Sequence, residues 1–162
     1  MIHIITGGRD TGKTARMREL HSALGGDGII SEKIFDAGEH TGYRALRLSG
    51  GRGRLLAGRK NTPRGLEIPR GGPVLGPWIF SAEGFLFSAG EFEEILEAGE
   101  GPLFLDEIGR LELSGEGFAP LLGRLLRSGR ELYFSCRDSF AGEVAEKFNI
   151  VNFSFIEVPA PL

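Results

Sequence analysis

The hydrophobic residues of the chain follow two periods, one typical of buried strands and the other of amphipathic helices. Short apolar or alternating segments predict strands at 2–5, 28–35, 78–80, 103–105, 131–135 and 150–158. Apolar residues at helical spacing predict helices at 13–24, 88–99, 118–129 and after 138. Strands that alternate with helices in this way predict an α/β sandwich, with a mainly parallel central sheet flanked by helices.

Local signals within this pattern predict helix ends, an added hairpin and a loop. Ser88 and Glu91 have the spacing of a capping box, and Asp138 stands where it can cap the last helix. Residues 42–57 are two extended pieces around a glycine-rich turn, which predicts an antiparallel hairpin. The stretch 59–77 contains four prolines and few apolar residues, so we expect an exposed loop that is poorly ordered without a ligand. We find no internal repeat and expect a single domain over residues 1–162.

The composition is that of an ordinary soluble globule, with 41% apolar and 25% charged residues. No apolar run approaches the length of a membrane span, and the first residues lack the pattern of a secretion signal. The single cysteine, Cys136, fits a reducing compartment and follows aromatic residues at the expected end of a strand, which indicates a buried, unreactive thiol. We therefore expect a cytoplasmic protein with no membrane partner. The oligomeric state stays open, with a monomer favoured.

The net charge of −3 hides an uneven distribution. Between residues 44 and 70 there are seven arginines and one lysine against a single acid, whereas Arg110 is the only base between 91 and 116. A basic stretch can attract nucleic acid or a second ligand that carries phosphate. Only Tyr43 offers an aromatic surface for base stacking, so the sequence favours a solvated connecting region over a nucleic-acid site.

The first apolar strand leads into a phosphate-binding motif. From Gly7 the sequence reads G-x-x-x-x-G-K-T, the Walker A pattern or P-loop, and a predicted helix follows. Glycines let backbone N–H groups turn toward phosphate oxygens, and the helix N-terminus adds partial positive charge. In this pattern Lys13 reaches the β- and γ-phosphates, and the Thr14 hydroxyl binds Mg²⁺. A plain glycine-rich turn would not require the full pattern between a strand and a helix. The predicted nucleotide site consists of Gly7, Gly8, Arg9, Asp10, Thr11, Gly12, Lys13 and Thr14.

A pair of carboxylates follows the apolar strand at 103–105. Ligands of open parallel sheets bind beyond the carboxyl ends of the strands, where both the P-loop and the pair Asp106-Glu107 stand. Asp106 fits the Walker B role of holding the Mg²⁺ that Thr14 also contacts. Glu107 stands one residue further out, where a carboxylate can orient or deprotonate a water aimed at the γ-phosphate. Alone, the pair is equally typical of a strand entering a turn; downstream of a P-loop it favours these functional roles.

With both halves of the site in view, the sequence resembles the small cytosolic nucleoside-triphosphatases of the P-loop class, which are related to RecA-type ATPases. The resemblance rests on TGGRDTGKT at 6–14, GYRALRLSGGRGRLLA at 42–57 and LFLDEIGRLEL at 103–113. The last stretch is close to the family's Asp-Glu-Ile-Gly signature and is far more specific than the P-loop. The final helix and strand also fall where those of the family do, so the resemblance spans essentially the whole chain.

The resemblance implies slow, Mg²⁺-dependent hydrolysis of ATP, GTP and other nucleoside triphosphates with little base selectivity. It also implies that Glu107 is the catalytic carboxylate and that Asp106 lies on the metal side. One departure is the segment Ser135-Cys136-Arg137-Asp138, which stands where the family usually has an aliphatic residue followed by proline. The sequence therefore leaves open which group contacts the γ-phosphate at that edge.

The leading hypothesis is a Mg²⁺-dependent nucleoside-triphosphate phosphohydrolase. Lys13 and Glu107 are its expected catalytic residues, together with an arginine that stabilises the charge developing on the phosphate. We assign this arginine to Arg137, at a strand end beside the site. Arg110 and Arg9 are alternatives, and each of the three fits a surface role equally well.

Two other functions fit the same motifs. A P-loop kinase would transfer the γ-phosphate to a small metabolite or nucleotide, with the basic segment 44–70 as an acceptor-binding arm or lid. A nucleotide-regulated binding module would use that segment to control a partner. The hydrolase is favoured because Glu107 directly follows Asp106 and because no second set of acids and aromatic residues in the sequence frames an acceptor pocket.

Overall fold

The computed structural model describes all residues from Met1 to Leu162, in nine strands and five helices. The strands are β1 (Ile2–Gly7), β2 (Asp27–Asp36), β3 (Glu39–Arg47), β4 (Gly53–Arg59), β5 (Gly71–Leu75), β6 (Trp78–Ser81), β7 (Leu103–Ile108), β8 (Leu132–Arg137) and β9 (Phe153–Glu157). The helices are α1 (Lys13–Leu24), α2 (Ala82–Ala98), α3 (Arg110–Leu113), α4 (Ala119–Arg127) and α5 (Asp138–Lys147). None of these helices combines the length and the apolar character needed to cross a membrane.

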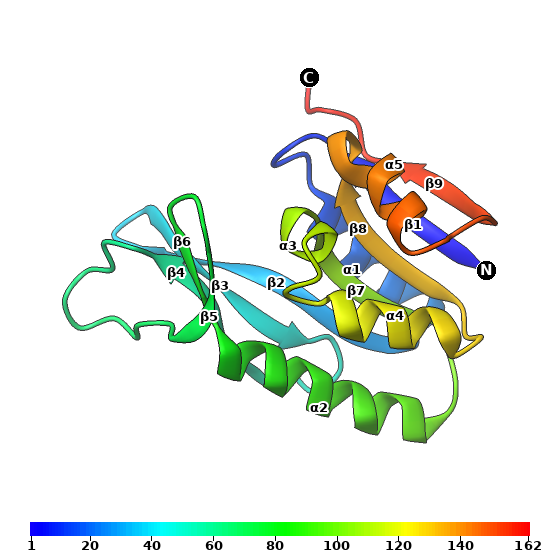
Figure 1. The fold of residues 1–162 in the computed structure, drawn as a ribbon, viewed down its shortest axis with the longest axis horizontal. Coiled ribbons are helices and arrows are strands. Elements are labelled where there is room, and N and C mark those ends of the chain that lie inside the picture. Colours follow the sequence, from blue (N-terminus) through cyan, green and yellow to red (C-terminus); the bar gives the residue numbers. More distant parts are fainter.

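The strands form one sheet in the order β5-β6-β4-β3-β2-β7-β8-β1-β9 (Figure 1). Neighbouring strands run parallel from β2 to β9 and antiparallel from β2 to β5. The predicted α/β sandwich with an antiparallel addition is confirmed. The addition is larger than one hairpin, because it contributes four of the eight strand pairs. The sheet is therefore parallel in the half that carries the phosphate-binding motif.

The two faces of the sheet bury different helices, because side chains alternate along each strand. On β1, Ile4 belongs to the larger core, which includes residues of α2, α4 and α5, whereas Ile5 packs with Met17 of α1 in the smaller core. All three side chains are completely buried. Burial of each contributes about 1.5–3 kcal/mol, so the alternation in β1 fixes which face α1 covers and where the P-loop starts.

Part of the stretch expected to be an exposed loop is a strand. Residues 71–75 form β5, which pairs with β6 at the edge of the sheet. Pro73 is compatible with this position because an edge strand does not need every N–H group for the ladder. The connection from 60 to 70 contains no helix or strand, as expected.

The helix α2 begins several residues before the predicted capping box. Ser81 is its N-cap, and the Ser81 Oγ accepts a hydrogen bond from the Gly84 N–H at 3.1 Å. Ser88 and Glu91 lie inside the helix, where Ser88 Oγ donates to Gly84 O at 2.9 Å and Glu91 binds arginines. The prediction was wrong because Glu91 binds tertiary partners, which the local spacing does not reveal, while Ser88 bonds to a carbonyl of the preceding helical turn. The helix ends as predicted at Gly99, whose φ of 80° lies in the left-handed region.

Two smaller differences follow β7 and β8. The short helix α3, which the sequence did not predict, precedes the expected helix, which begins at Ala119. Asp138 is the first residue of α5 rather than its cap, and Arg137 occupies the N-cap position without a side-chain hydrogen bond. The Asp138 carboxylate still lies in the first helical turn, where negative charge is favourable.

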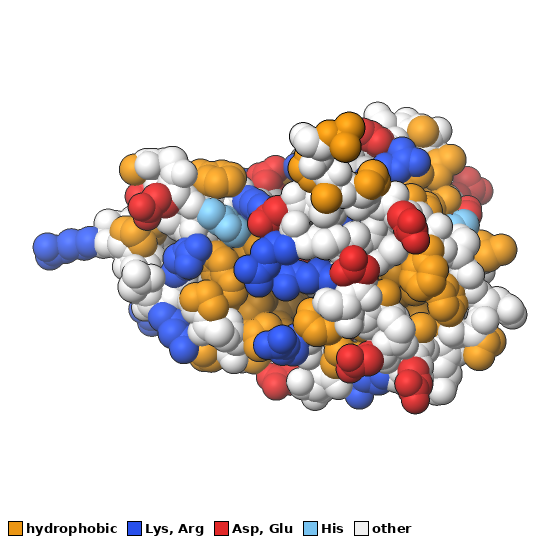
Figure 2. Space-filling view, turned by 90° about the horizontal axis from the view of Figure 1, so that it is seen from above, with side chains coloured by type: hydrophobic (Ala, Val, Ile, Leu, Met, Phe, Trp, Pro, Cys, Tyr) orange, Lys and Arg blue, Asp and Glu red, His pale blue; other side chains and the backbone are white.

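The antiparallel strands project away from the remainder of the fold (Figure 1). A cavity of about 500 Å³ lies between these strands and the segments around α3 and the P-loop. Figure 2 looks onto the molecule from above and shows Lys and Arg side chains gathered beside a hollow with hydrophobic walls. The cavity is therefore lined by residues from both halves of the sheet.

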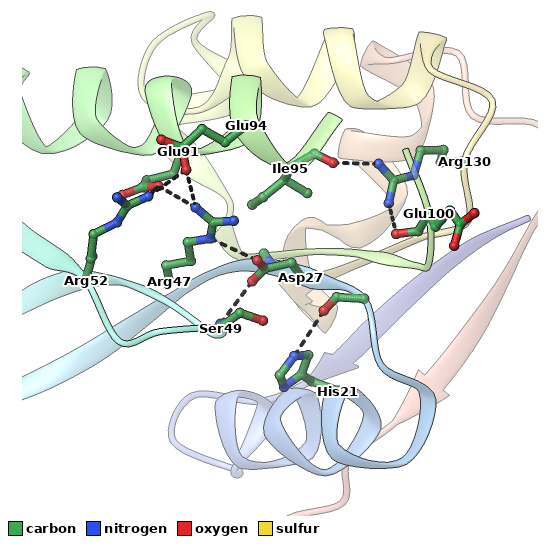
Figure 3. Close-up of polar contacts among 12 residues, drawn as sticks. His21, Asp27, Arg47, Ser49, Arg52, Glu91, Glu94, Ile95, Glu100 and Arg130 are labelled. Carbon is green, nitrogen blue, oxygen red and sulfur yellow. Dashed lines mark hydrogen bonds and ion pairs between the residues drawn. The ribbon is translucent and has the colours of Figure 1, made fainter. Parts of the chain in front are cut away.

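An ion-pair network ties the two halves together (Figure 3). Arg47, at the end of β3, binds Asp27 at the start of β2 and Glu91 of α2, both at 2.8 Å. Asp27 also accepts the Ser49 N–H at 3.0 Å, and Arg52 binds Glu91 at 2.5 Å. The side chains of Arg47, Asp27 and Glu91 are only 15%, 14% and 6% exposed. These three side chains therefore lie largely out of water, whereas Arg52 is 55% exposed, and the network positions α2 against the hairpin.

Removal of Arg47 should destabilise the fold, because Asp27 would remain buried without its charged partner. We expect Arg47→Ala to lower the free energy of unfolding by about 3 kcal/mol, measured by urea denaturation. The matched control is Arg18→Ala. Its guanidinium also binds a carboxylate, Glu32, but the pair is 48% and 41% exposed, so the loss should stay below about 1 kcal/mol. Equal losses in the two variants would contradict a stabilising role for the network.

Candidate active site

Three neighbouring strands of the parallel half end at the same edge of the sheet. The strand order is β7-β8-β1, and the register places Gly7 beside Arg137 and Cys136 beside Ile108. The ends of these strands carry the P-loop, the segment from 135 to 137 and the pair of carboxylates predicted from the sequence. The fold thus brings together segments that are far apart in the chain, at the edge where open parallel sheets bind ligands.

The segment between β1 and α1 has the geometry of a phosphate cradle. A Cβ at Gly7 would lie 2.5 Å from Val158 O, and Gly12 has a φ of 97°, so both positions require glycine. No side chain caps the N-terminus of α1, and its first turn contains no acid. Its first N–H groups are therefore available to an anion. The Lys13 side chain folds back over the loop and donates to Gly8 O at 2.5 Å.

The remaining loop residues stabilise the loop or face solvent. Thr11 Oγ1 donates to Gly8 O at 3.1 Å. Asp10 has a φ of 54° and is ion-paired with Lys33 of β2, with 2.6 Å between Nζ and Oδ1. Arg9 is exposed. The sequence did not predict the contact of Asp10 with Lys33, which attaches the loop to the long strand β2.

Asp106 joins three elements through one buried carboxylate. Its Oδ2 accepts hydrogen bonds from Thr14 Oγ1 at 2.7 Å and from the Ser31 N–H at 3.0 Å. Its Oδ1 accepts a hydrogen bond from Ser135 Oγ at 2.5 Å. Asp106 is only 1% exposed. Through these contacts α1, β2 and β8 are held against the end of β7.

The chemistry around Asp106 fits Mg²⁺. Burial raises the pKa of Asp106, against the hydrogen bonds from Ser135 and Thr14, so a nearby cation would favour its ionised form. The adjacent Ser31 hydroxyl is buried and has no hydrogen-bond partner. Mg²⁺ is commonly held by one or two carboxylates together with waters and substrate phosphates. Thr14 and Asp106 are the candidates for holding it, since no group of three or more His, Cys, Asp or Glu side chains forms another metal site.

Glu107 faces the cavity in a backbone conformation that is uncommon for a residue with a side chain. Its φ is 64°, and its N–H donates to Ser135 Oγ at 2.7 Å. Its carboxylate reaches solvent within the cavity, but the surrounding protein displaces much of the bulk water. This desolvation raises the pKa of Glu107 to about 7, with a further contribution from the charge of Asp106 and an opposing one from Lys13. Ser135 thus contacts the Asp106 carboxylate and the Glu107 backbone, a role that the sequence did not predict.

All three arginines considered from the sequence line the cavity. Arg137 lies at the end of β8, Arg110 at the start of α3 and Arg9 in the P-loop. None of the three forms an ion pair within 4.0 Å. The Arg110 guanidinium stands over the ring of Phe140, 5.6 Å from its centroid. The geometry therefore retains all three as candidates for a phosphate contact and does not single out Arg137.

The cavity also has an aromatic wall that the sequence analysis did not find. Its aromatic lining residues are His40, Tyr43, Trp78, Phe80, Phe85, Phe118 and Phe140. These residues come from β3, β6, α2, the loop before α4, and α5. No set of acids and aromatic residues was expected from the sequence to frame an acceptor pocket, and these aromatic residues beside Lys13 and Glu107 were missed. The signal was absent from the sequence because the wall is assembled from segments up to 100 positions apart.

Two further buried groups shape the loop after β7. The Glu112 carboxylate accepts hydrogen bonds from the N–H groups of Gly109 and Phe118, both at 2.8 Å, and so closes the loop around α3. Burial raises the pKa of Glu112 to about 7. Cys136, on the neighbouring strand, is 1% exposed, and burial raises its pKa to about 12, which confirms the expectation of a buried thiol. Glu112 follows the Asp-Glu-Ile-Gly stretch in the sequence, but its structural role there was not predicted.

Solved structures with the same fold include two proteins from distant organisms. One is the crystal structure of THEP1 from the hyperthermophile Aquifex aeolicus, with a TM-score of 0.71 and 18% identity, over 98% of this chain and 90% of that one. The other is the solution structure of a human cancer-related nucleoside triphosphatase, with a TM-score of 0.65 and 20% identity, over 96% and 87% of the two chains. No curated protein matches the sequence. At these identities the likeness establishes the fold.

The sequence itself matches a family of proteins described as NTPases. The match extends over residues 3–158 and therefore includes the P-loop, both carboxylates, strands β2 to β9 and β1 from its second residue. This extent agrees with the resemblance found from the sequence motifs. The chain belongs to the NTPase family and is a nucleoside-triphosphate-hydrolysing enzyme.

Proposed function

We propose that this NTPase releases the γ-phosphate of ATP, GTP and other nucleoside triphosphates with low base selectivity, and that it requires Mg²⁺. The observation that supports this proposal most strongly is a continuous set of hydrogen bonds. It runs from Thr14 at the start of α1 through Asp106 and Ser135 to the backbone of Glu107. These hydrogen bonds connect the helix that follows the phosphate-binding loop to the backbone of Glu107, whose carboxylate faces the cavity.

The P-loop binds the triphosphate, and Lys13 neutralises charge on the β- and γ-phosphates. Lys13 is 7% exposed, and its ammonium group lies against the loop carbonyls. Phosphate oxygens offer this group stronger acceptors than neutral carbonyls do. When bound, Mg²⁺ would neutralise the phosphate charge that develops during cleavage; Thr14 and Asp106 would hold it. Arg9, Arg110 and Arg137 supply further positive charge on the cavity side.

Glu107 acts on the attacking water. Its carboxylate faces the cavity, and the hydrogen bond from its backbone N–H to Ser135 Oγ holds the residue in place beside Asp106. A carboxylate at this place can orient a water toward the γ-phosphate and accept its proton as the new phosphorus–oxygen bond forms. We therefore assign Glu107 the role of catalytic base and Ser135 that of a positioning residue.

Low base selectivity follows from the kind of contacts that the P-loop makes. Backbone N–H groups and the helix N-terminus bind phosphate oxygens, which are the same in every nucleoside triphosphate. The proposed catalytic groups, Lys13, Asp106 and Glu107, also lie where the phosphates bind. Binding energy and catalysis are thus concentrated on the part of the substrate that does not differ among ATP, GTP, CTP and UTP.

Lys13→Ala should abolish phosphate release and weaken nucleotide binding, because it removes the ammonium group from the phosphate site. The measurements are phosphate release with the four common nucleoside triphosphates and binding of a labelled nucleotide. Lys60→Ala is the control, since Lys60 is exposed and does not line the cavity. Near-native turnover of Lys13→Ala would contradict the assignment of the P-loop.

Glu107→Gln should separate binding from chemistry. The amide keeps the shape of the side chain but cannot accept the proton, so hydrolysis should fall by about 100-fold while nucleotide still binds. Asp106→Asn should behave differently and raise the Mg²⁺ concentration needed for half-maximal turnover. The two variants are compared in magnesium titrations of phosphate release. A parental rate for Glu107→Gln would mean that another group activates the water.

Ser135→Ala should lower kcat about tenfold with little change in KM. The substitution removes the hydroxyl that donates to the Asp106 carboxylate and accepts the Glu107 N–H, but leaves the P-loop intact. Ser139→Ala, on the exposed face of the adjacent helix α5, is the control. A loss of stability alone would appear as a lower midpoint of unfolding with unchanged kcat at low temperature, and that result would contradict the positioning role.

A further inference from the structure

The cavity beside Glu107 is much larger than hydrolysis requires. Its volume of about 500 Å³ lies in the range of small-molecule pockets, whereas one water molecule occupies about 30 Å³. Its far wall is built by β3, β4, β6 and the turn before β6. These antiparallel elements do not contribute to the P-loop or to the carboxylate pair. They add a separate surface in front of the same reaction centre.

The far wall presents aromatic rings to the cavity. The ring centroid of Trp78 lies 5.1 Å from that of Tyr43 and 5.1 Å from that of His40. All three side chains are only partly buried, so part of their surface remains available to a ligand. Burial raises the pKa of Tyr43 to about 12, which keeps its hydroxyl protonated and able to donate a hydrogen bond. A wall of this kind favours a flat ring.

The same wall carries positive charge. The Arg59 guanidinium lies over the Trp78 ring, 4.8 Å from its centroid, and uses its Nε–H to bind His40 O at 2.8 Å. Arg59 forms no ion pair with a carboxylate within 4.0 Å. A guanidinium placed over an aromatic ring, with N–H groups that have no partner, suits a carboxylate or phosphate attached to a planar ligand. Figure 2 shows basic side chains gathered at this hollow.

The cavity opens on the γ-phosphate end of the nucleotide site. Lys13 and Glu107 line it, whereas Gly12 and Thr14, at the start of α1, do not. In a P-loop the lysine reaches the β- and γ-phosphates, while the loop amides cradle the α- and β-phosphates. A bound triphosphate therefore directs its γ end into the cavity and its nucleoside away from it. The Ser31 hydroxyl, on a residue only 4% exposed, is an unpartnered polar group at this end.

We propose that the cavity binds a small aromatic anion with a hydroxyl group, and that this hydroxyl accepts the γ-phosphoryl group of the bound nucleoside triphosphate. The ring stacks on Trp78 and Tyr43, and the anionic group binds Arg59. The proposal rests on the function proposed above, because it uses the same P-loop and the same Glu107. It adds a second substrate, and hydrolysis is the reaction that occurs when water alone fills the cavity.

The transfer balances without any further reactant. The ligand oxygen forms a bond to the γ-phosphorus, and its proton passes to the Glu107 carboxylate. The bond between the γ-phosphorus and the β–γ bridging oxygen breaks, and the nucleoside diphosphate leaves with that electron pair. The products are the phosphorylated ligand and a nucleoside diphosphate.

The probe for this site is adenosine 3′-monophosphate, which combines an aromatic base, an anionic group and a primary hydroxyl. With GTP as the donor, we expect mass spectrometry to detect adenosine 3′,5′-bisphosphate, formed faster than inorganic phosphate. Binding of the probe alone is measured by calorimetry in the presence of GDP. Absence of both saturable binding and the bisphosphate would overturn the proposal.

Two cavity variants and one control test the wall. Trp78→Leu and Arg59→Gln should each weaken probe binding and lower bisphosphate formation about tenfold or more, while phosphate release without the probe stays within about twofold. Arg64→Gln is the matched control, because Arg64 lies in the same basic segment but outside the cavity. Trp78→Leu keeps an apolar side chain at this position. Arg59→Gln supplies a second test if Trp78→Leu is unstable. Transfer that is unaffected by both variants would overturn the assignment of the wall.

Other results distinguish this proposal from two alternatives: that the cavity binds the base of the donor nucleotide, and that the proposed hydrolase function itself fails. If Trp78→Leu weakened GTP, GDP and probe binding in equal proportion, and GDP competed with the probe, the cavity would hold the donor's base and the proposal would be wrong. If GTP were not cleaved by the parent protein, the proposed hydrolase function would fail. Probe binding that depends on Trp78 would, even then, support the second-ligand site.

Discussion

The carboxylate of Asp106 is the contact on which the site depends. It is almost completely buried and accepts hydrogen bonds from the hydroxyls of Thr14 and Ser135 and from the Ser31 N–H. These partners belong to the P-loop helix and to the two strands that flank β7. A buried carboxylate is costly unless its oxygens are satisfied, so the three elements are stable together only in this arrangement. The position of the P-loop relative to Glu107 follows from the same contact.

The second constraint is the length of β2. Its first residues pair parallel with β7, and its remaining residues pair antiparallel with β3, so this one strand joins the two halves of the sheet. Arg47 and Asp27 fix the start of β2 to the end of β3, and Glu91 extends the network to α2. The projecting strands are held in place over the phosphate site by this connection. The cavity is the consequence, because its two walls belong to different halves of one continuous sheet.

Charge in the cavity is arranged for ligands rather than for internal stability. Several arginines outside the cavity are paired with carboxylates, as Arg47 and Arg52 are with Glu91, and others, such as Arg127, are exposed to solvent. Arg9, Arg110 and Arg137, which line the cavity, form no such pair. A site that handles a triphosphate needs positive charge that the protein has not already neutralised. The aromatic wall lines the same cavity, and the two together define the surface that a second molecule would contact.

The sequence by itself determined the α/β fold class, the P-loop and the pair Asp106-Glu107, because these depend on consecutive residues and on periodic burial. It did not reveal the start of α2, since Ser88 and Glu91 have the local spacing of a cap, but Ser88 bonds to the preceding helical turn and Glu91 binds arginines from distant segments. The strand β5 was missed because prolines and glycines indicate a loop wherever no neighbouring strand is known. Only the tertiary structure decided that Ser135 contacts the Asp106 carboxylate and the Glu107 N–H, and that Trp78 and Glu107 line the same cavity. Such contacts join residues that no local pattern relates, and they exist because burial and strand pairing bring distant segments together.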